Sequence, residues 1–184
     1  MLLLLVAVCA TSFSCIERKP ERLAKQESPV TTELAAMVEE LEQFRDSLSA
    51  DQETLVAVRK RHRDAVYRLV AKALIREPQD LYRAALVLEA EEGEAQICLL
   101  AHYLAAEAAR KGYQPARFLT AACLDRYRVL SGSSQAYGTQ HYKGSDGLFH
   151  LYPIDSTTTD SVRAVWGVPS LDSLEAEIEA MNSH

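Results

Sequence analysis

Apolar residues recur at steps of three and four along most of the chain, which is the spacing of an amphipathic α-helix. One stripe begins after Thr31, and a second follows Ser49-x-x-Gln52, which has the form of a helix-starting capping box. The two stripes keep nearly the same period, so the two helices are expected to pack as an antiparallel hairpin over residues 31–77. Pro78 ends this unit, because proline disfavours helical geometry in the residue before it.

Three further helices are expected at the start of a domain that spans residues 78–184. They lie near residues 79–92, 94–111 and 115–131, and a glycine follows each of them. The middle helix is apolar on nearly all sides, so it should lie at the centre of the body. The spacing of Ala and Gly along these helices resembles tetratricopeptide or Sel1-like helical repeats.

After Gly132 the helical period gives way to alternation, which is typical of strands. Residues 137–142 and 148–152 are predicted to form one small β-hairpin at about 137–152, with Asp146-Gly147 in its turn. A short helix and a last helix capped by Ser170 follow, and the last helix is expected to close the core. The predicted fold is mostly α: a helical hairpin and a tetratricopeptide- or Sel1-like helical body with one small β-hairpin.

The segment 1–15, MLLLLVAVCATSFSC, has no charged side chain and has an apolar block followed by small residues. This pattern is typical of a signal peptide. As a helix it would rise only about 22 Å, against about 30 Å for a hydrocarbon core, so it is short for a membrane span. Cys15, followed by a polar linker over residues 16–30, favours a bacterial lipoprotein with its lipid attached there. Ordinary cleavage after Ser14 is the alternative.

The composition narrows the class of partner. A formal net charge of -6 argues against sequence-independent binding to nucleic acid. The one dense basic run, residues 59–63, is expected to pair with acidic residues of the facing helix rather than with lipid headgroups. His62 and His102 fall within helical patterns and are interpreted as packed or hydrogen-bonded histidines rather than ligands.

Only Cys98 and Cys123 remain after the predicted signal peptide, which is too few for a disulfide framework or a zinc site. Their stagger along two antiparallel helices would permit a bridge, but buried free thiols are the favoured interpretation. The chain has no Walker loop, HExxH helix or serine elbow. No metal and no cofactor are therefore predicted.

Several short motifs in the second half of the chain resemble a widespread group of bacterial proteins of unknown function. They are Leu124-Asp125-Arg126-Tyr127, the stretch from Gly132 to Gln140 (GSSQAYGTQ), Pro153-Ile154-Asp155 and Trp166-Gly167-Val168-Pro169. The resemblance covers roughly residues 80–181 and does not reach the hairpin over 31–77. No reaction is assigned to that group, so the resemblance supports an architecture and marks a place in the chain.

The region marked by these motifs contains the candidate site that the sequence predicts. The candidate polar residues are Asp125, Arg126, Gln135, Tyr137, Gln140 and His141. In a catalytic interpretation Arg126 binds an anion and Asp125 or His141 moves a proton. In the favoured structural interpretation these groups satisfy one another and hold the β-hairpin on the helix end. Asp125 could also pair with Arg128, three residues further along the same helix.

These observations lead to one functional expectation and two alternatives. The expectation is a lipid-anchored protein of the bacterial cell envelope that binds another envelope protein or a cell-wall component without catalysis. Its only membrane contact would be the N-terminal lipid, and export as a soluble secreted or periplasmic protein is the alternative location. The first alternative function is a hydrolase or transferase with its site between Asp125/Arg126 and Tyr137 to His141. The second is a purely structural lipoprotein. An enzyme should show converging titratable groups in a pocket, and a binding module an exposed apolar groove.

Overall fold

The computed structural model describes residues 27–46, 51–90 and 93–183. The predicted signal peptide over 1–15, Cys15 itself and most of the linker over 16–30 lie outside the described residues. The helices and strands within the described ranges are α1 (Pro29–Asp46), α2 (Gln52–Ala71), α3 (Pro78–Glu89), α4 (Ala95–Arg110), α5 (Ala116–Leu130), β1 (His141–Lys143), β2 (Phe149–Leu151), α6 (Asp160–Val165) and α7 (Leu171–Asn182).

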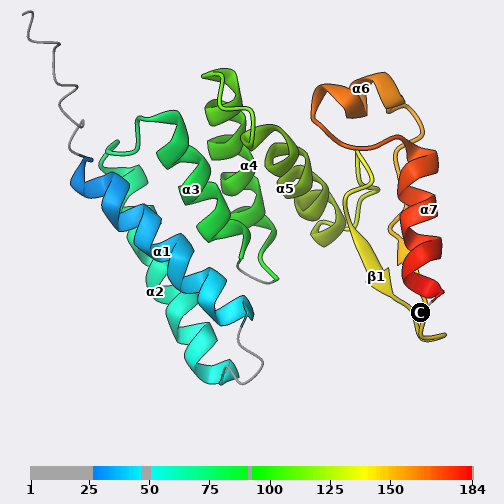
Figure 1. Ribbon diagram of the computed structural model, residues 1–184, viewed down its shortest axis with the longest axis horizontal. Coiled ribbons are helices and arrows are strands. Elements are labelled where there is room, and N and C mark those ends of the chain that lie inside the picture. The colour runs from blue at the N-terminus through cyan, green and yellow to red at the C-terminus, as the bar shows by residue number, and fades with distance from the viewer. Residues whose placement is uncertain (1–26, 47–50, 91–92, 184) are drawn as a thin grey trace, which may run out of the picture.

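The fold is mostly helical with one small antiparallel β-hairpin, as the sequence predicts. Figure 1 shows α1 and α2 at one end of the molecule, then α3, α4 and α5 in succession. The β-hairpin, α6 and α7 lie beyond α5 at the other end. In the hairpin Tyr142 pairs with His150, one residue from each strand. The likeness to tetratricopeptide or Sel1 repeats stays a prediction.

The start of α2 differs from the predicted capping box. Asp51 is the N-cap residue, and its carboxylate accepts hydrogen bonds from the amide and the hydroxyl of Thr54 at 2.9 and 2.8 Å. These bonds hold the pKa of Asp51 below its usual value. An aspartate is as good a cap as a serine and its charge also suits the positive end of the helix dipole. Ser49 lies outside the described residues.

Helices α1 to α5 share one hydrophobic core. Alanines allow α3 and α4 to come close to their neighbours, as expected for the apolar middle helix. Those that are fully buried are Ala84, Ala85, Ala101, Ala105 and Ala108. The core includes Leu34 of α1, Val66 of α2 and Leu88 of α3, so it continues across residues 77 and 78, where the sequence suggested a domain boundary.

The two cysteines of the helical body are buried in this core as free thiols, which confirms the favoured interpretation. Burial raises the pKa of Cys98 and, more strongly, that of Cys123. The thiolate is the reactive form of cysteine, so burial disfavours the reactive form of both side chains. His102 is also satisfied within the body, because its Nδ1 lies 2.9 Å from the carbonyl oxygen of Thr120.

The basic run on α2 pairs with acidic residues, and part of it pairs across the hairpin as predicted. Arg61 bonds both carboxylate oxygens of Glu40 on α1 at 2.7 Å, and Lys60 bonds Asp64 one turn along its own helix at 2.8 Å. His62 is buried, and its Nε2 lies 2.9 Å from the Glu40 carboxylate. No described helix is long and apolar enough to cross a membrane.

The burial of His62 predicts that the stability of the α1–α2 hairpin falls in mild acid. Desolvation lowers the pKa of His62 below its usual value of about 6.5. As the pH falls below that value, the unfolded chain takes up the proton before the folded chain does, so the free energy of unfolding decreases. Urea unfolding at about pH 7.5 and about pH 5.5 measures this decrease. The His62→Gln variant should show less of it, whereas the exposed control His141→Gln should leave it unchanged. Equal pH dependence in all three proteins would contradict the prediction.

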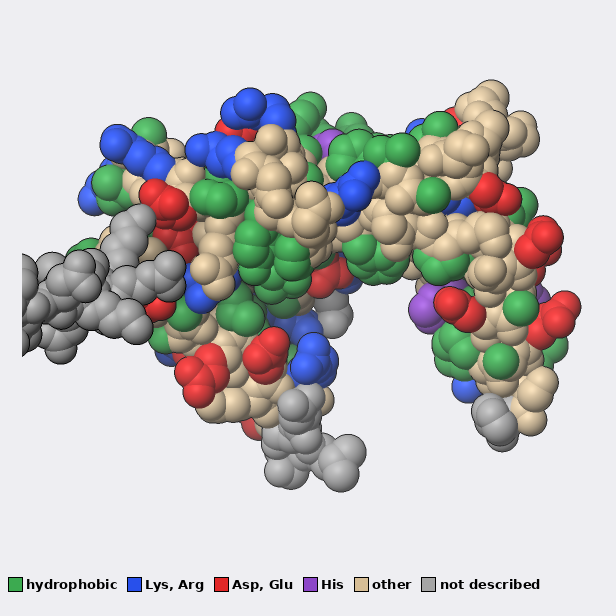
Figure 2. All heavy atoms as spheres, turned by 45° about the horizontal axis from the view of Figure 1, so that its top comes forward, with side chains coloured by type: hydrophobic (Ala, Val, Ile, Leu, Met, Phe, Trp, Pro, Cys, Tyr) green, Lys and Arg blue, Asp and Glu red, His purple; other side chains and the backbone are tan. Residues whose placement is uncertain are grey.

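A second, smaller hydrophobic cluster joins α5 to the part of the chain that follows it. It contains Ala121, Val168 and Leu174, with Tyr137, Leu151 and Trp166 packed against it. Residues 135–183, here called the C-terminal lobe, therefore have their own contact with α5. Figure 2 shows Asp and Glu side chains on this lobe, while most of the Lys and Arg side chains in view lie over the helical body.

Helix α7 covers this second cluster, so it does not close the main core as predicted. Leu174 is its one buried residue among those described, and Met181, in the last turn of the helix, is 39% exposed. The expected N-cap, Ser170, is present and accepts from the amide of Ser173. At the other end of α7, the Asn182 side chain bonds both the amide and the carbonyl of Phe149 in β2. These bonds tie α7 to the edge of the β-hairpin.

Candidate functional site

The carboxylate of Asp125 is the centre of the polar cluster that the sequence singled out. Asp125 is 0% exposed and lies in the last turns of α5. Its two oxygens accept the backbone amides of four successive residues, Ala136, Tyr137, Gly138 and Thr139, at 2.6 to 3.2 Å. The Thr139 hydroxyl adds a further bond at 2.9 Å. Residues 136–139, here called the Asp125 loop, are thus wrapped around one buried anion, as in an anion-binding nest.

This wrapping corrects the predicted first strand. The sequence predicted a strand over 137–142, but β1 begins only at His141. Successive amides cannot all point to one carboxylate in an extended strand, because they alternate in direction there. Gly138 makes the turn possible at φ +96°, and a Cβ at this position would lie 2.8 Å from a methyl group of Leu174.

Gln135 makes a second buried anchor beside the first. Its side-chain amide donates to the carbonyls of Gln140 and Tyr152 at 3.0 and 2.9 Å, and its side-chain oxygen accepts the Gln140 amide at 2.8 Å. The backbone of Gln135 also pairs in parallel with Ile154, through bonds to Pro153 and Asp155. Every polar atom of this fully buried side chain is therefore used.

A salt bridge that the sequence did not predict also joins α5 to the C-terminal lobe. Arg128 bonds Asp155 at 3.1 Å rather than Asp125. Hydrogen bonds from Thr157 and from Arg128 hold the pKa of Asp155 below its usual range. Since Asp125 already accepts five donors from residues 136–139, its carboxylate has no need of an arginine.

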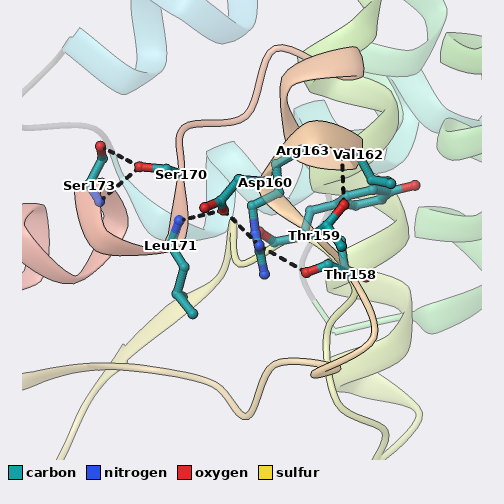
Figure 3. A network of polar contacts seen from close by, with 9 residues as sticks. Thr158, Thr159, Asp160, Val162, Arg163, Ser170, Leu171 and Ser173 are labelled. Carbon is teal, nitrogen blue, oxygen red and sulfur yellow. Dashed lines mark hydrogen bonds and ion pairs between the residues drawn. The ribbon is translucent and has the colours of Figure 1, made fainter.

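Arg163 is a buried residue of this junction that sequence reasoning missed. It is 3% exposed and donates to the carbonyls of Tyr137 and Thr158 and to the carboxylate of Asp160, at 2.9 to 3.0 Å. Figure 3 shows Arg163 between Thr158 and Asp160, with Asp160 also accepting the amide of Leu171. The arginine thus links the Asp125 loop to α6 and α7. No local pattern around a single arginine in a six-residue helix signals this role.

The other candidate residues do not meet at Asp125. Arg126 points to α3, where it bonds the carbonyl and the carboxylate of Glu89, both at 2.9 Å. His141 is exposed on β1, and its ring packs edge-on against Phe149. Within the described residues, no hydrogen bond or ion pair joins Arg126 or His141 to the Asp125 carboxylate. The structure therefore brings together Asp125, Gln135 and Gln140, with Tyr137 contributing its amide and carbonyl.

The hydrogen bonds of this cluster attach the C-terminal lobe to α5. Gln140 uses its side chain to reach the Ala122 carbonyl and the Thr139 hydroxyl. The Tyr137 ring packs edge-on against Trp166, and burial raises the pKa of its hydroxyl. Among the described residues, no three His, Cys, Asp or Glu side chains converge so as to hold a metal ion. The Thr139 hydroxyl donates to the Asp125 carboxylate and accepts from the Gln140 side chain, so both of its bonds lie within the cluster.

A groove elsewhere on the helical body is the feature most suited to a ligand. We call it the α1–α3 groove; its cavity volume is about 340 Å³, and it is lined by α1, α2 and α3 with one residue of α5. Its apolar lining comprises Val38, Leu41, Leu55, Leu86 and Ala90, and its charged lining comprises Glu42, Arg45, Arg59, Glu89 and Arg126. Of the candidate residues from the sequence, only Arg126 reaches it.

Comparison with known proteins adds no identification. No family model matches the chain, and searches of the curated proteins and of the solved structures found no match. The resemblance to a group of bacterial proteins of unknown function therefore stays a prediction.

Proposed function

We propose that this protein is an exported bacterial envelope protein, lipid-anchored at Cys15, which acts as a non-catalytic binding module for another envelope component. The leader-like segment 1–15 and the charged, proline-containing segment 16–30 support the location and suggest a tether. Neither a cofactor nor nucleic acid enters this proposal, and the membrane is contacted through the lipid alone. Mass spectrometry of the mature N-terminus tests the anchor, because acylated Cys15 is expected there and an unmodified Cys15 contradicts it.

The α1–α3 groove is the observation that carries the binding role. A volume of about 340 Å³ lies within the usual range of ligand sites, and an apolar lining with a few charged groups is their usual composition. The described lining contains no Ser, Thr, Cys, His or Asp side chain. It therefore provides surface for recognition but neither a nucleophile nor a histidine base.

The alternative, a hydrolase or transferase between Asp125/Arg126 and Tyr137 to His141, has less support. Its proposed proton carrier, Asp125, is buried and accepts five donors from the Asp125 loop. Its proposed anion-binding residue, Arg126, is engaged with Glu89 at the groove. The geometry thus favours binding over catalysis.

Site-specific photocrosslinking in the native cells tests this function. A photoreactive phenylalanine analogue at Leu55 places the reactive group in the groove, and the same analogue at Tyr103, 62% exposed on α4, is the matched control. We expect a discrete, light-dependent adduct from position 55 that position 103 does not give. The same adduct from both positions, or none from position 55, would contradict a binding role for the groove.

A further inference from the structure

We infer that an exposed aromatic surface on the β-hairpin binds a neutral saccharide chain. This surface, here called the aromatic face, consists of Tyr142 on β1, His150 on β2 and Tyr152 directly after β2. Figure 1 shows the hairpin at the opposite end of the molecule from α1 and α2, so the aromatic face is separate from the α1–α3 groove. The inference therefore adds a second ligand and does not depend on the function proposed for the groove.

The strand register brings the three side-chain rings of the aromatic face together. Tyr142 and His150 are direct partners in the ladder, and their ring centroids lie 5.5 Å apart. Tyr152, two residues after His150, lies on the same side of the chain, and its ring centroid is 4.8 Å from that of Tyr142. The ring planes are inclined to each other at 33° and 45°. The rings thus form one continuous strip rather than a closed stack.

The strip is open to solvent. Tyr142 is 41% exposed, the His150 side chain is 40% exposed and Tyr152 is half-buried. Within the described residues, neither tyrosine hydroxyl forms a hydrogen bond. The opposite face of the same hairpin is the one that packs, because Leu151 contacts the second hydrophobic cluster and Phe149 is bonded to α7 through its backbone. Two tyrosines on the outward face are therefore available to a ligand.

Buried hydrogen bonds hold the aromatic face in place. The Gln135 side chain donates to the carbonyl of Tyr152 at 2.9 Å and to the carbonyl of Gln140, the residue before β1, at 3.0 Å. The Tyr152 amide also donates to the Gln140 carbonyl at 3.3 Å. A preformed surface loses little conformational entropy when a ligand binds. Tyrosines fixed in this way are suited to recognition, since each offers a large contact area with few rotatable bonds.

Aromatic rings with free hydroxyls match the chemistry of a sugar. The face of an aromatic ring carries partial negative charge and attracts weakly positive C–H groups. A β-linked pyranose chain presents C–H groups on the flat faces of its sugars, while its hydroxyl groups point outward from their edges. The strip can therefore contact the sugar faces, and the tyrosine hydroxyls can donate to or accept from the sugar hydroxyls.

The charges around the strip favour a neutral ligand. The Asp146 carboxylate lies beside it and pairs with His150 Nε2 at 2.9 Å, so it repels phosphate and carboxylate groups. Within the described residues its Oδ2 atom accepts no other bond, which leaves it able to accept a sugar hydroxyl. Lys143 lies on the opposite face, 5.5 Å from the centroid of the Phe149 ring. Nucleic acids and phospholipids, whose binding needs cations beside the stacking surface, fit these charges poorly.

Chemical-shift titration of the mature chain tests the inference. The probes are the tetramers of β-1,4-linked glucose and of β-1,4-linked N-acetylglucosamine, which share the C–H faces and differ in one substituent. We expect both to shift the amide signals of residues 141–152 and to leave those of α1 and α2 in place. The tetramer with the lower Kd identifies the source of the chain. Salt should change either Kd by less than about twofold, because no ion pair forms with the ligand.

A matched pair of substitutions separates the aromatic face from the hairpin as a whole. Tyr142→Leu removes a ring from the aromatic face but keeps an apolar side chain, so the Kd should rise by about tenfold. Phe149→Leu makes the same kind of change on the opposite face and should keep the Kd within about twofold of the unaltered chain. The amide spectrum of each variant shows whether the hairpin is intact, and Tyr152→Leu supplies a second test if Tyr142→Leu disturbs it.

Three results would overturn the inference. The first is the absence of shifts in the hairpin at millimolar concentrations of either tetramer. The second is a Tyr142→Leu variant whose Kd rises no more than that of Phe149→Leu. The third is binding of a blocked proline-rich peptide at the same amides by a chain that binds neither tetramer, which would assign the aromatic face to a peptide. None of these results bears on photocrosslinking at position 55, so the function proposed for the groove is tested separately.

Discussion

Replacing Asp125 with asparagine is expected to lower the free energy of unfolding by about 3–5 kcal/mol. The substitution keeps the size of the side chain but removes its charge, and it turns one acceptor oxygen into an NH2 donor. Each oxygen of the Asp125 carboxylate accepts at least two backbone amides of the Asp125 loop. In either orientation of the asparagine side chain, its NH2 group would replace one of these oxygens and face N–H donors instead of accepting from them. Several buried amides lose their partner at once, which is why the expected effect is large.

Urea unfolding of the mature chain measures this loss, and amide hydrogen exchange locates it. Exchange should accelerate more at residues 136–139 and in the rest of the C-terminal lobe than in α3 and α4, because the Asp125 loop attaches the lobe to α5. The control is Asp64→Asn, since Asp64 is an exposed residue whose bond to Lys60 is a surface salt bridge. An unchanged unfolding midpoint with protected loop amides would show that the carboxylate is not the anchor.

Replacing Gln135 with leucine is expected to cost about 3 kcal/mol. Leucine fills a similar volume, so the loss comes from hydrogen bonds rather than from a cavity. Three backbone groups lose the hydrogen-bond partner that the buried Gln135 side chain provides: the Gln140 amide, the Gln140 carbonyl and the Tyr152 carbonyl. These groups lie on both sides of the β-hairpin, so the hairpin should loosen while α1 to α5 remain packed.

The same unfolding measurement tests this expectation, with Gln114→Leu as the control. Gln114 is exposed before α5, and its side chain is bonded to Arg117 at 3.1 Å. That control should change the stability by about 0.5 kcal/mol or less. A Gln135→Leu variant as stable as the control would indicate that the hairpin is held by its apolar contacts alone.

These two anchors bear on the meaning of the sequence motifs. Asp125, Gln135, Gly138 and Gln140 belong to the stretches for which the sequence predicts a resemblance to a bacterial group of unknown function, and all four build the junction between α5 and the C-terminal lobe. In this chain these residues therefore build the architecture of the junction, and of the motif residues only Arg126 is among the described residues that line the α1–α3 groove.

The helices and their approximate ends follow from the sequence because a helix satisfies its backbone within itself. Apolar spacing placed α1 to α5 and α7, and the glycines after α4 and α5 adopt positive φ at Gly112 and Gly132. The apolar character of α4 was enough to predict its central place, and the capping signal at Ser170 marked the start of α7. The β-hairpin was also found, with its first strand too long.

Only the tertiary structure decided how polar residues are paired and where a ligand could bind. Arg126 pairs with Glu89, which is 37 residues away, and Arg128 pairs with Asp155, 27 residues away. Local spacing cannot choose among such partners, since each depends on which helix ends come together. The Asp125 loop formed because a buried carboxylate needs several donors, and the nearest supply was the backbone that the sequence pattern had assigned to a strand. The α1–α3 groove likewise exists only where four helices meet, and its lining residues come from helices that are far apart in the sequence.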